Sequence, residues 1–159
     1  MLPGKEESVS ETTTARDIGR TVIAVDLAKS VFEVAVSTRP GQVRLRRRLT
    51  RSALLEFFAQ QPAAMVLLEA CGTAHFWARE LERLGHQVRL LPAQHVRRYR
   101  IGNKTDRADA KALLEAFRND EIRPVPVKIL AQQELTALHR ARAVLAAAHQ
   151  QREPDAVRA

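Results

Sequence analysis

Apolar residues near the start of the chain form two runs separated by a short polar break. Residues 21–27 and 31–37 are almost continuously apolar, and residues 42–49 alternate apolar side chains with arginines. Runs of this length and alternation are typical of strands, and Pro40-Gly41 supplies a turn before the third. We therefore expect an antiparallel meander of these three segments, whose last strand has one strongly basic face.

The apolar spacing changes to a helical period after Thr50, which is a suitable N-cap for a helix that ends before Pro62. The apolar run at 63–70 predicts a strand buried on both faces and parallel to a neighbour. A helix over 72–84 and a strand over 86–91 complete a strand-helix-strand unit. The side chains expected to be buried on the two helices are Leu54, Leu55, Phe57, Phe58, Phe76, Trp77, Leu81 and Leu84.

The last third of the chain predicts a helix over 105–117, an extended connector with Pro124 and Pro126, and a long helix over 130–151. The long helix carries a stripe of small and apolar side chains that suits packing against another helix. We expect an α/β domain at 21–128, in which antiparallel strands are followed by parallel ones in a mixed sheet flanked by helices. The long helix, at 129–151, is expected to begin a coiled coil, and the segments 1–20 and 152–159 are expected to be flexible tails.

Composition narrows the class of protein. The 159 residues fit one domain and carry a formal net charge of +8, which favours a polyanionic partner such as nucleic acid or an anionic membrane surface. No apolar run reaches membrane-spanning length, and the N-terminal segment has no signal-peptide core, so we expect a cytoplasmic protein. One cysteine, Cys71, supports neither a disulfide framework nor a cysteine-based zinc site.

Two stretches without acidic residues, between Glu33 and Glu56 and between Glu82 and Asp106, hold much of the positive charge. Arginine dominates both stretches, which suits phosphate contacts. A solvated surface would explain either stretch alone, but both together favour nucleic acid. The candidate nucleic-acid-binding residues are Arg44, Arg46, Arg48, Arg97, Arg98, Arg100 and Lys104.

Two carboxylates follow directly on predicted buried strands. Asp26 comes after an apolar run where an uncompensated charge is costly, and it is either a turn former or a metal ligand. Glu69 ends the strand at 63–70, where open α/β sheets place their ligands. It is otherwise the first exposed residue after the strand.

Two further acids, Asp106 and Asp109, share one face of the predicted helix at 105–117. Acids in a first helical turn interact favourably with the helix dipole, but here the same face continues through apolar residues and is therefore the buried side. Two like charges on a buried face are best explained by a cation between them and other acids. Together with Asp26 and Glu69 they form an oxygen-only ligand set suited to Mg²⁺ or Mn²⁺, and such ions support phosphodiester cleavage or strand transfer.

Three segments carry a resemblance to a known family: VIAVDLAKSVFEVAV, LLEACGTAHFWARELERLGHQVRLLPAQHV and NKTDRADA. Over residues 20–148 the sequence resembles the DEDD-type insertion-sequence transposases, whose N-terminal domain has a RuvC-like, RNase H fold. The family's tetrad falls on Asp26, Glu69, Asp106 and Asp109. The resemblance implies divalent-metal cleavage of DNA at element ends and targets, assembly into oligomers and, in characterised members, a structured guide RNA.

The sequence departs from the family after the first part of its coiled-coil helix. Family members continue into a second domain with a nucleophilic serine, so we expect a truncated copy that forms homo-oligomers through its last helix. The alternative is a catalytically silent fragment that binds DNA or RNA. Two enzyme hypotheses are weaker. A sugar-kinase or actin-like ATPase would need a glycine-rich phosphate turn, which the residues after Asp26 do not supply. A thiol hydrolase built on Cys71 and His75 would need a third, orienting group, and the sequence shows none.

Overall fold

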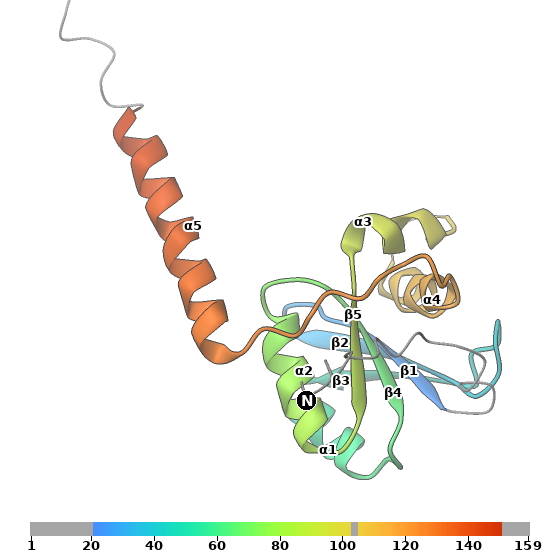
Figure 1. The fold of residues 1–159 in the computed structure, drawn as a ribbon. Helices are drawn as coiled ribbons and strands as arrows, with labels where there is room; N and C mark the ends of the chain where they lie inside the picture. Colours follow the sequence, from blue (N-terminus) through green and yellow to red (C-terminus); the bar gives the residue numbers. More distant parts are fainter. Residues whose placement is uncertain (1–20, 103–104, 151–159) are drawn as a thin grey trace, which may run out of the picture.

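The computed structural model describes residues 21–102 and 105–150. They form a mixed α/β structure in which a five-stranded sheet has helices on both faces (Figure 1). The mixed α/β class expected from the sequence is confirmed. The expected flexible tails, 1–20 and 152–159, lie outside the described residues.

The sheet has the strand order β3-β2-β1-β4-β5. β1 is antiparallel to β2, which is antiparallel to β3, while β1, β4 and β5 run parallel to one another. The antiparallel meander followed by parallel strands is therefore confirmed. The strand bounds are Val22–Asp26 for β1, Val31–Ser37 for β2, Leu45–Thr50 for β3, Met65–Glu69 for β4 and Gln87–Leu91 for β5.

The predicted start of the third strand at residue 42 is wrong, because the preceding turn takes up those residues. The backbone N–H of Gln42 donates to the Arg39 carbonyl at 3.2 Å, and Gly41 has a φ of 76°, which glycine adopts without steric cost. The ladder of paired residues between β2 and β3 begins only at Val36 and Leu45.

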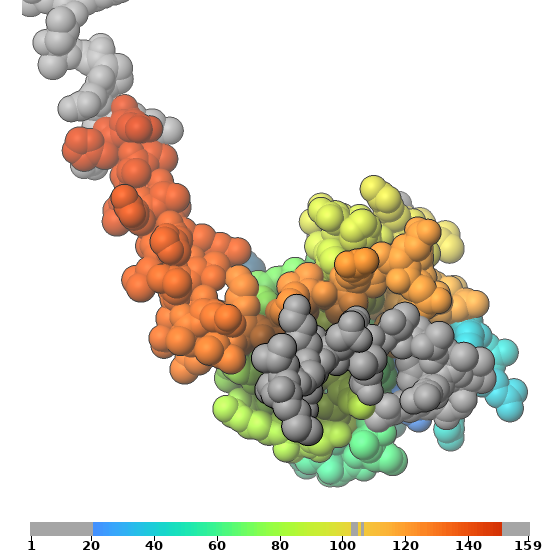
Figure 2. Space-filling view, viewed as in Figure 1, coloured from blue at the N-terminus to red at the C-terminus, as the bar shows by residue number. Residues whose placement is uncertain are grey.

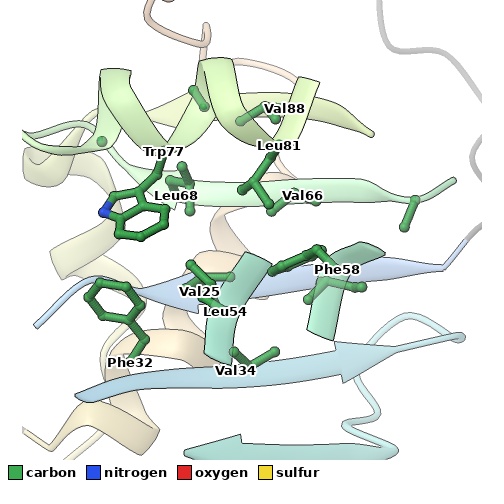
Figure 3. Packing of buried hydrophobic residues seen from close by; sticks show 14 of the residues in the cluster. Val25, Phe32, Val34, Leu54, Phe58, Val66, Leu68, Trp77, Leu81 and Val88 are labelled. Atoms are coloured by element: carbon green, nitrogen blue, oxygen red, sulfur yellow. The ribbon is translucent and has the colours of Figure 1, made fainter. Parts of the chain in front are cut away.

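One face of the sheet is covered by α1, Arg51–Ala59, and α2, Ala74–Arg83 (Figure 1). Thr50 caps α1 as expected, its hydroxyl accepting from the Ala53 N–H at 3.3 Å. The packed residues on this face, shown in Figure 3, include Val25, Phe32, Val34, Leu54, Phe58, Val66, Leu68, Trp77, Leu81 and Val88.

The burial predicted for Phe76 and Leu84 is wrong, since they are 46% and 41% exposed. The stripe of α2 that faces the sheet runs instead through Trp77 and Leu81, which are buried. Helical geometry places Phe76 one residue to the side of that stripe, and Leu84 lies beyond the last residue of the helix.

The opposite face of the sheet is covered by α4, Asp106–Phe117, which lies against β1 and β2. Thr105 caps α4 by accepting from the Ala108 N–H at 3.1 Å. A short helix α3, Ala93–Val96, and a 3-10 turn η1, Arg97–Tyr99, pack against α4. The buried side chains between α4 and the sheet include Ala24, Ala35, Leu67, Ala110 and Leu113.

The connector after α4 runs beside the edge strand β5 and leads to α5, Leu130–Gln150. Its Val125 N–H donates to the Leu90 carbonyl at 2.7 Å, and its Lys128 N–H donates to His75 Nδ1 at 3.1 Å. α5 then extends away from the sheet and helices, as Figures 1 and 2 show, and none of its described residues is buried. The predicted long helix is confirmed, and its apolar stripe is exposed within this chain.

The hydrogen bond to His75 makes the stability of this connection depend on pH. Burial, together with the nearby charges of Lys128 and Arg79, lowers the pKa of His75 below its ordinary value. The unfolded chain therefore binds this proton more readily than the folded one, and the associated stability is lost as pH falls below about 6.5. We expect the free energy of unfolding, measured by urea titration, to decrease over that window in the wild type.

His75→Gln keeps an acceptor but removes the titrating group, so its unfolding free energy should depend less on pH. The matched control is His139→Gln, at an exposed position of α5, which should behave as the wild type. Equal pH dependence in all three proteins would contradict the role of His75.

Candidate active site

Two of the predicted site residues, Asp26 and Glu69, lie at the same edge of the sheet. The register between the parallel strands β1 and β4 pairs Val25 with Leu68, so Asp26 and Glu69 are the next residue on each strand. Side chains alternate along a strand, and Ala24 and Leu67, two residues earlier, pack under α4. Asp26 and Glu69 therefore belong to the sheet face that α4 covers, and both are half-buried.

A further acid, Glu33, lies in the same row and was missed from the sequence. It is the antiparallel partner of Asp26 and is only 6% exposed. On its other side it pairs with Arg48 of β3, whose Nε lies 3.9 Å from the Glu33 carboxylate. The available signal was the charged residue interrupting the apolar run VFEVAV. In a hairpin with Asp26, that position falls on the face of Asp26.

Asp109 is held on α4, on the side of the helix that faces the sheet. It is 8% exposed, as predicted from its place on the apolar stripe. Its Oδ1 forms an ion pair with Nε of Arg100, a residue that follows η1 and has a side chain 20% exposed. The two atoms are in contact without hydrogen-bond geometry. The buried charge of Asp109 is therefore compensated by an arginine that the sequence had suggested for nucleic-acid contact.

The structure places the predicted ligand set only in part. Asp106 is the first residue of α4, and its side chain is not among those described. Among the side chains that are described, no acids, histidines and cysteines are grouped closely enough to hold a metal ion. The strand ends bring Asp26 and Glu69 together, and α4 carries Asp109 over the same face. All of these are carboxylates, so the arrangement offers hard oxygen donors and no nitrogen or sulfur ligand.

The described basic residues predicted to bind nucleic acid lie on or next to β3 and in or just after η1. Arg46 is half-buried and Arg48 exposed on β3, and both share the face of Glu33 because they alternate with Leu45 and Leu49. Arg44 is exposed just before β3, and Arg97 and Arg98 are exposed in η1. Lys104 lies outside the described residues.

The alternative site at Cys71 and His75 is organised differently from a thiol and its base. Both residues line a cavity of about 310 Å³ beside the start of α5. His75 Nδ1 already accepts the Lys128 N–H, and Cys71 Sγ lies 3.5 Å from the Thr73 hydroxyl. This geometry gives the histidine a structural role in holding the connector.

Of the helices described, none has the length and apolar character needed to cross a bilayer.

The family model and the curated proteins that match this chain are all described as transposases. Residues 23–153 match the family model of IS110-type DEDD proteins described as transposase. The chain is 47% identical over 123 residues to a probable family 20 transposase of Pseudomonas aeruginosa, covering 77% of this chain and 36% of that protein. It is 39% identical over 125 residues to the transposase for insertion sequence element IS1328 of Yersinia enterocolitica, covering 79% and 37%.

A third relative is the transposase for insertion sequence element IS1111A of Coxiella burnetii, 36% identical over 117 residues, with 74% of this chain and 32% of that protein covered. The chain thus spans about a third of the length of the curated relatives it matches. No solved structure matches the chain at a significant level.

The contact between Arg100 and Asp109 makes a testable contribution to stability. Arg100→Gln leaves a buried carboxylate without its counter-charge, which typically costs about 3–5 kcal/mol. We expect the unfolding free energy to fall by that amount in urea titration at neutral pH. Arg98→Gln removes the same charge from an exposed position nearby and should change stability by less than about 0.5 kcal/mol. Equal effects of the two substitutions would show that Arg100 does not compensate Asp109.

Proposed function

The chain belongs to the IS110-type family of DEDD transposases, and from this premise we propose that it is a transposase catalytic domain that uses divalent metal ions to cut or transfer DNA strands. The observation that carries the proposal is the row of acids at the shared edge of β1 and β4, beneath α4. The chain spans only about a third of the length of its relatives. We therefore propose only strand cleavage or transfer by this domain, and not the complete activity of the longer proteins.

An RNase H-like, RuvC-like fold is part of this proposal. The support is the strand order β3-β2-β1-β4-β5 with an antiparallel meander followed by parallel strands. In that arrangement the first strand is central, so its terminal Asp26 is flanked by strands on both sides. The same arrangement explains why acids distant in sequence are assigned to one site.

The donor set fits a divalent ion in its chemistry. Asp26, Glu69 and Asp109 offer only carboxylate oxygens, and Oδ1 of Asp109 is buried without a hydrogen bond. Oxygen ligands of this kind favour Mg²⁺ or Mn²⁺. We propose that these residues and Asp106 hold the metal. Asp109 would have to exchange its contact with Arg100 for one with the ion.

The protein's part in the reaction is to fix these carboxylates. Bound divalent ions supply Lewis-acid stabilisation of the attacking and leaving oxygens in phosphodiester cleavage. β1 and β4 position Asp26 and Glu69 through their parallel register, and α4 positions Asp109 through its packing on the sheet. The rigid elements keep the ligands in place, and the basic residues near β3 and η1 would hold the DNA strand.

DNA at element ends and targets is the partner that this function requires, and a guide RNA is a further partner suggested by the family resemblance. A homo-oligomer formed through the last helix is also part of the proposal. Its support is the exposed apolar stripe of α5, which includes Leu138, Val144 and Leu145. Exposed apolar side chains repeated along one helix are typical of a surface that packs on another helix.

A binding-only role is the second candidate function. The observation that favours it is the ion pair of Arg100 with Asp109, because it already neutralises one of the proposed ligands. In this role the arginines would hold DNA or RNA, and the carboxylates would serve stability alone. A measurement of metal affinity distinguishes the two functions, because only the catalytic role requires the carboxylates to bind a divalent ion.

The decisive variant is Asp26→Asn, which keeps the shape of the side chain but removes its charge. We expect Mn²⁺ binding, measured by titration calorimetry, to weaken at least about tenfold, and Mg²⁺-dependent nicking of branched or element-end DNA to be lost with it. Asp120→Asn, at an exposed position remote from the row, should bind and nick as the wild type does. Unchanged Mn²⁺ affinity in Asp26→Asn would favour the binding-only role.

A further inference from the structure

A cleft of about 350 Å³ opens between β3 and the first turn of α4, next to the proposed active site. Its lining residues are Glu33, Arg46, Arg47, Arg48, Thr105 and Arg107. Glu33, one of the lining residues, is the direct cross-strand partner of Asp26. Thr105, another of them, caps the helix that carries Asp109. The cleft therefore shares its walls with the site that would hold the metal.

Arginines from two elements distant in the sequence meet in this cleft. Nη1 of Arg46 donates to the backbone carbonyl of Arg107 at 3.2 Å, which fastens β3 to the start of α4. Burial, followed by the positive charge of Arg107, lowers the pKa of Arg46, while Glu33 acts in the opposite direction. Arginine remains charged despite such a shift. The fold thus holds two like charges close together, at an energetic cost that a bound anion would offset.

Glu33 is the acid that lies beside these arginines. It is almost fully buried, faces Arg48 across the strands at 3.9 Å, and acts electrostatically on Arg46. Among the described side chains that line the cleft, the guanidinium groups outnumber the one carboxylate of Glu33, so this lining carries a net positive charge. The amino end of α4 adds the positive end of a helix dipole to the same place.

We propose that this cleft binds the phosphodiester backbone of the DNA strand beside the bond that is cut. The inference rests on the proposed function, because it takes the row of acids as the place where the cut occurs. Asp26 and Arg48 lie on strands separated by one strand, a distance of about 10 Å. Neighbouring phosphates of one strand can therefore reach the acids and the cleft together. Arginines present several donors to phosphate oxygens, which suits backbone contacts independent of base sequence.

The test measures binding of the full chain to a short fluorescein-labelled single-stranded DNA by fluorescence anisotropy. EDTA is present so that no divalent ion can bridge the carboxylates and the DNA. Arg107→Gln and Arg48→Gln should each weaken binding about fourfold at about 0.15 M salt. Each should also reduce the slope of log affinity against log salt by about 0.7. Arg142→Gln removes the same charge from an exposed position on α5 and should change neither quantity by this amount.

Thermal unfolding of each variant provides the folding control, because Arg48→Gln also leaves Glu33 without its nearest cation. If that variant unfolds, Arg107→Gln carries the test. Equal losses in Arg107→Gln and Arg142→Gln, or no loss in either, would overturn the proposal. Losses seen only with an RNA of the same sequence would also overturn it, since the occupant would then be RNA.

DNA affinity and Mn²⁺ affinity are measured separately, so the results distinguish a failure of this inference from a failure of the proposed function. If Arg107→Gln weakens DNA binding while Asp26→Asn leaves Mn²⁺ affinity unchanged, the cleft is a DNA-binding site, but the proposed strand cleavage beside it fails. If Asp26→Asn loses Mn²⁺ while the arginine variants bind DNA normally, the proposed function stands and this inference fails.

Discussion

The burial of negative charge on one face of the sheet is the constraint on which the structure depends. Glu33 and Asp109 are almost fully enclosed, and Asp26 and Glu69 are half-buried beside them. Burying a carboxylate is costly unless an opposite charge or hydrogen bonds compensate it. The chain supplies arginines from both sides, Arg48 from the edge strand and Arg100 from the turn that packs on α4. The basic character of the chain is thus partly a requirement of its own fold.

This constraint links the fold to function. The acids lie at the ends of neighbouring strands, and the helix that covers this face contributes another acid. The guanidinium groups of Arg48 and Arg100 lie beside two of these acids, Glu33 and Asp109. The chain belongs to a transposase family, and the proposed function would give these charges a use that structural stability alone does not require. The exposed α5, which buries no described residue within the chain, is the element available for contacts beyond this domain.

Much of the fold followed from local patterns in the sequence. The period of apolar residues identified the strands and helices, and Thr50 and Thr105 marked helix starts because their hydroxyls cap the first turn. The inward position of Asp109 followed from the helical stripe it shares with Leu113. The contacts that the sequence did not predict depend on how elements distant in the chain pack together. The contact of Arg100 with Asp109 and the pairing of Glu33 with Arg48 require knowledge of which elements lie side by side. Phe76 was misjudged because hydrophobicity alone does not specify which side of a helix faces the sheet.

The central proposal is that Asp26, Glu69, Asp106 and Asp109 act together as ligands of a divalent ion. A crystal structure of the chain soaked with Mn²⁺, with anomalous scattering used to locate the ion, tests it most directly. The account predicts an anomalous peak bounded by these carboxylates, with Arg100 displaced from Asp109. A peak elsewhere, or none at this edge of the sheet at saturating Mn²⁺ with the ion pair intact, would contradict it.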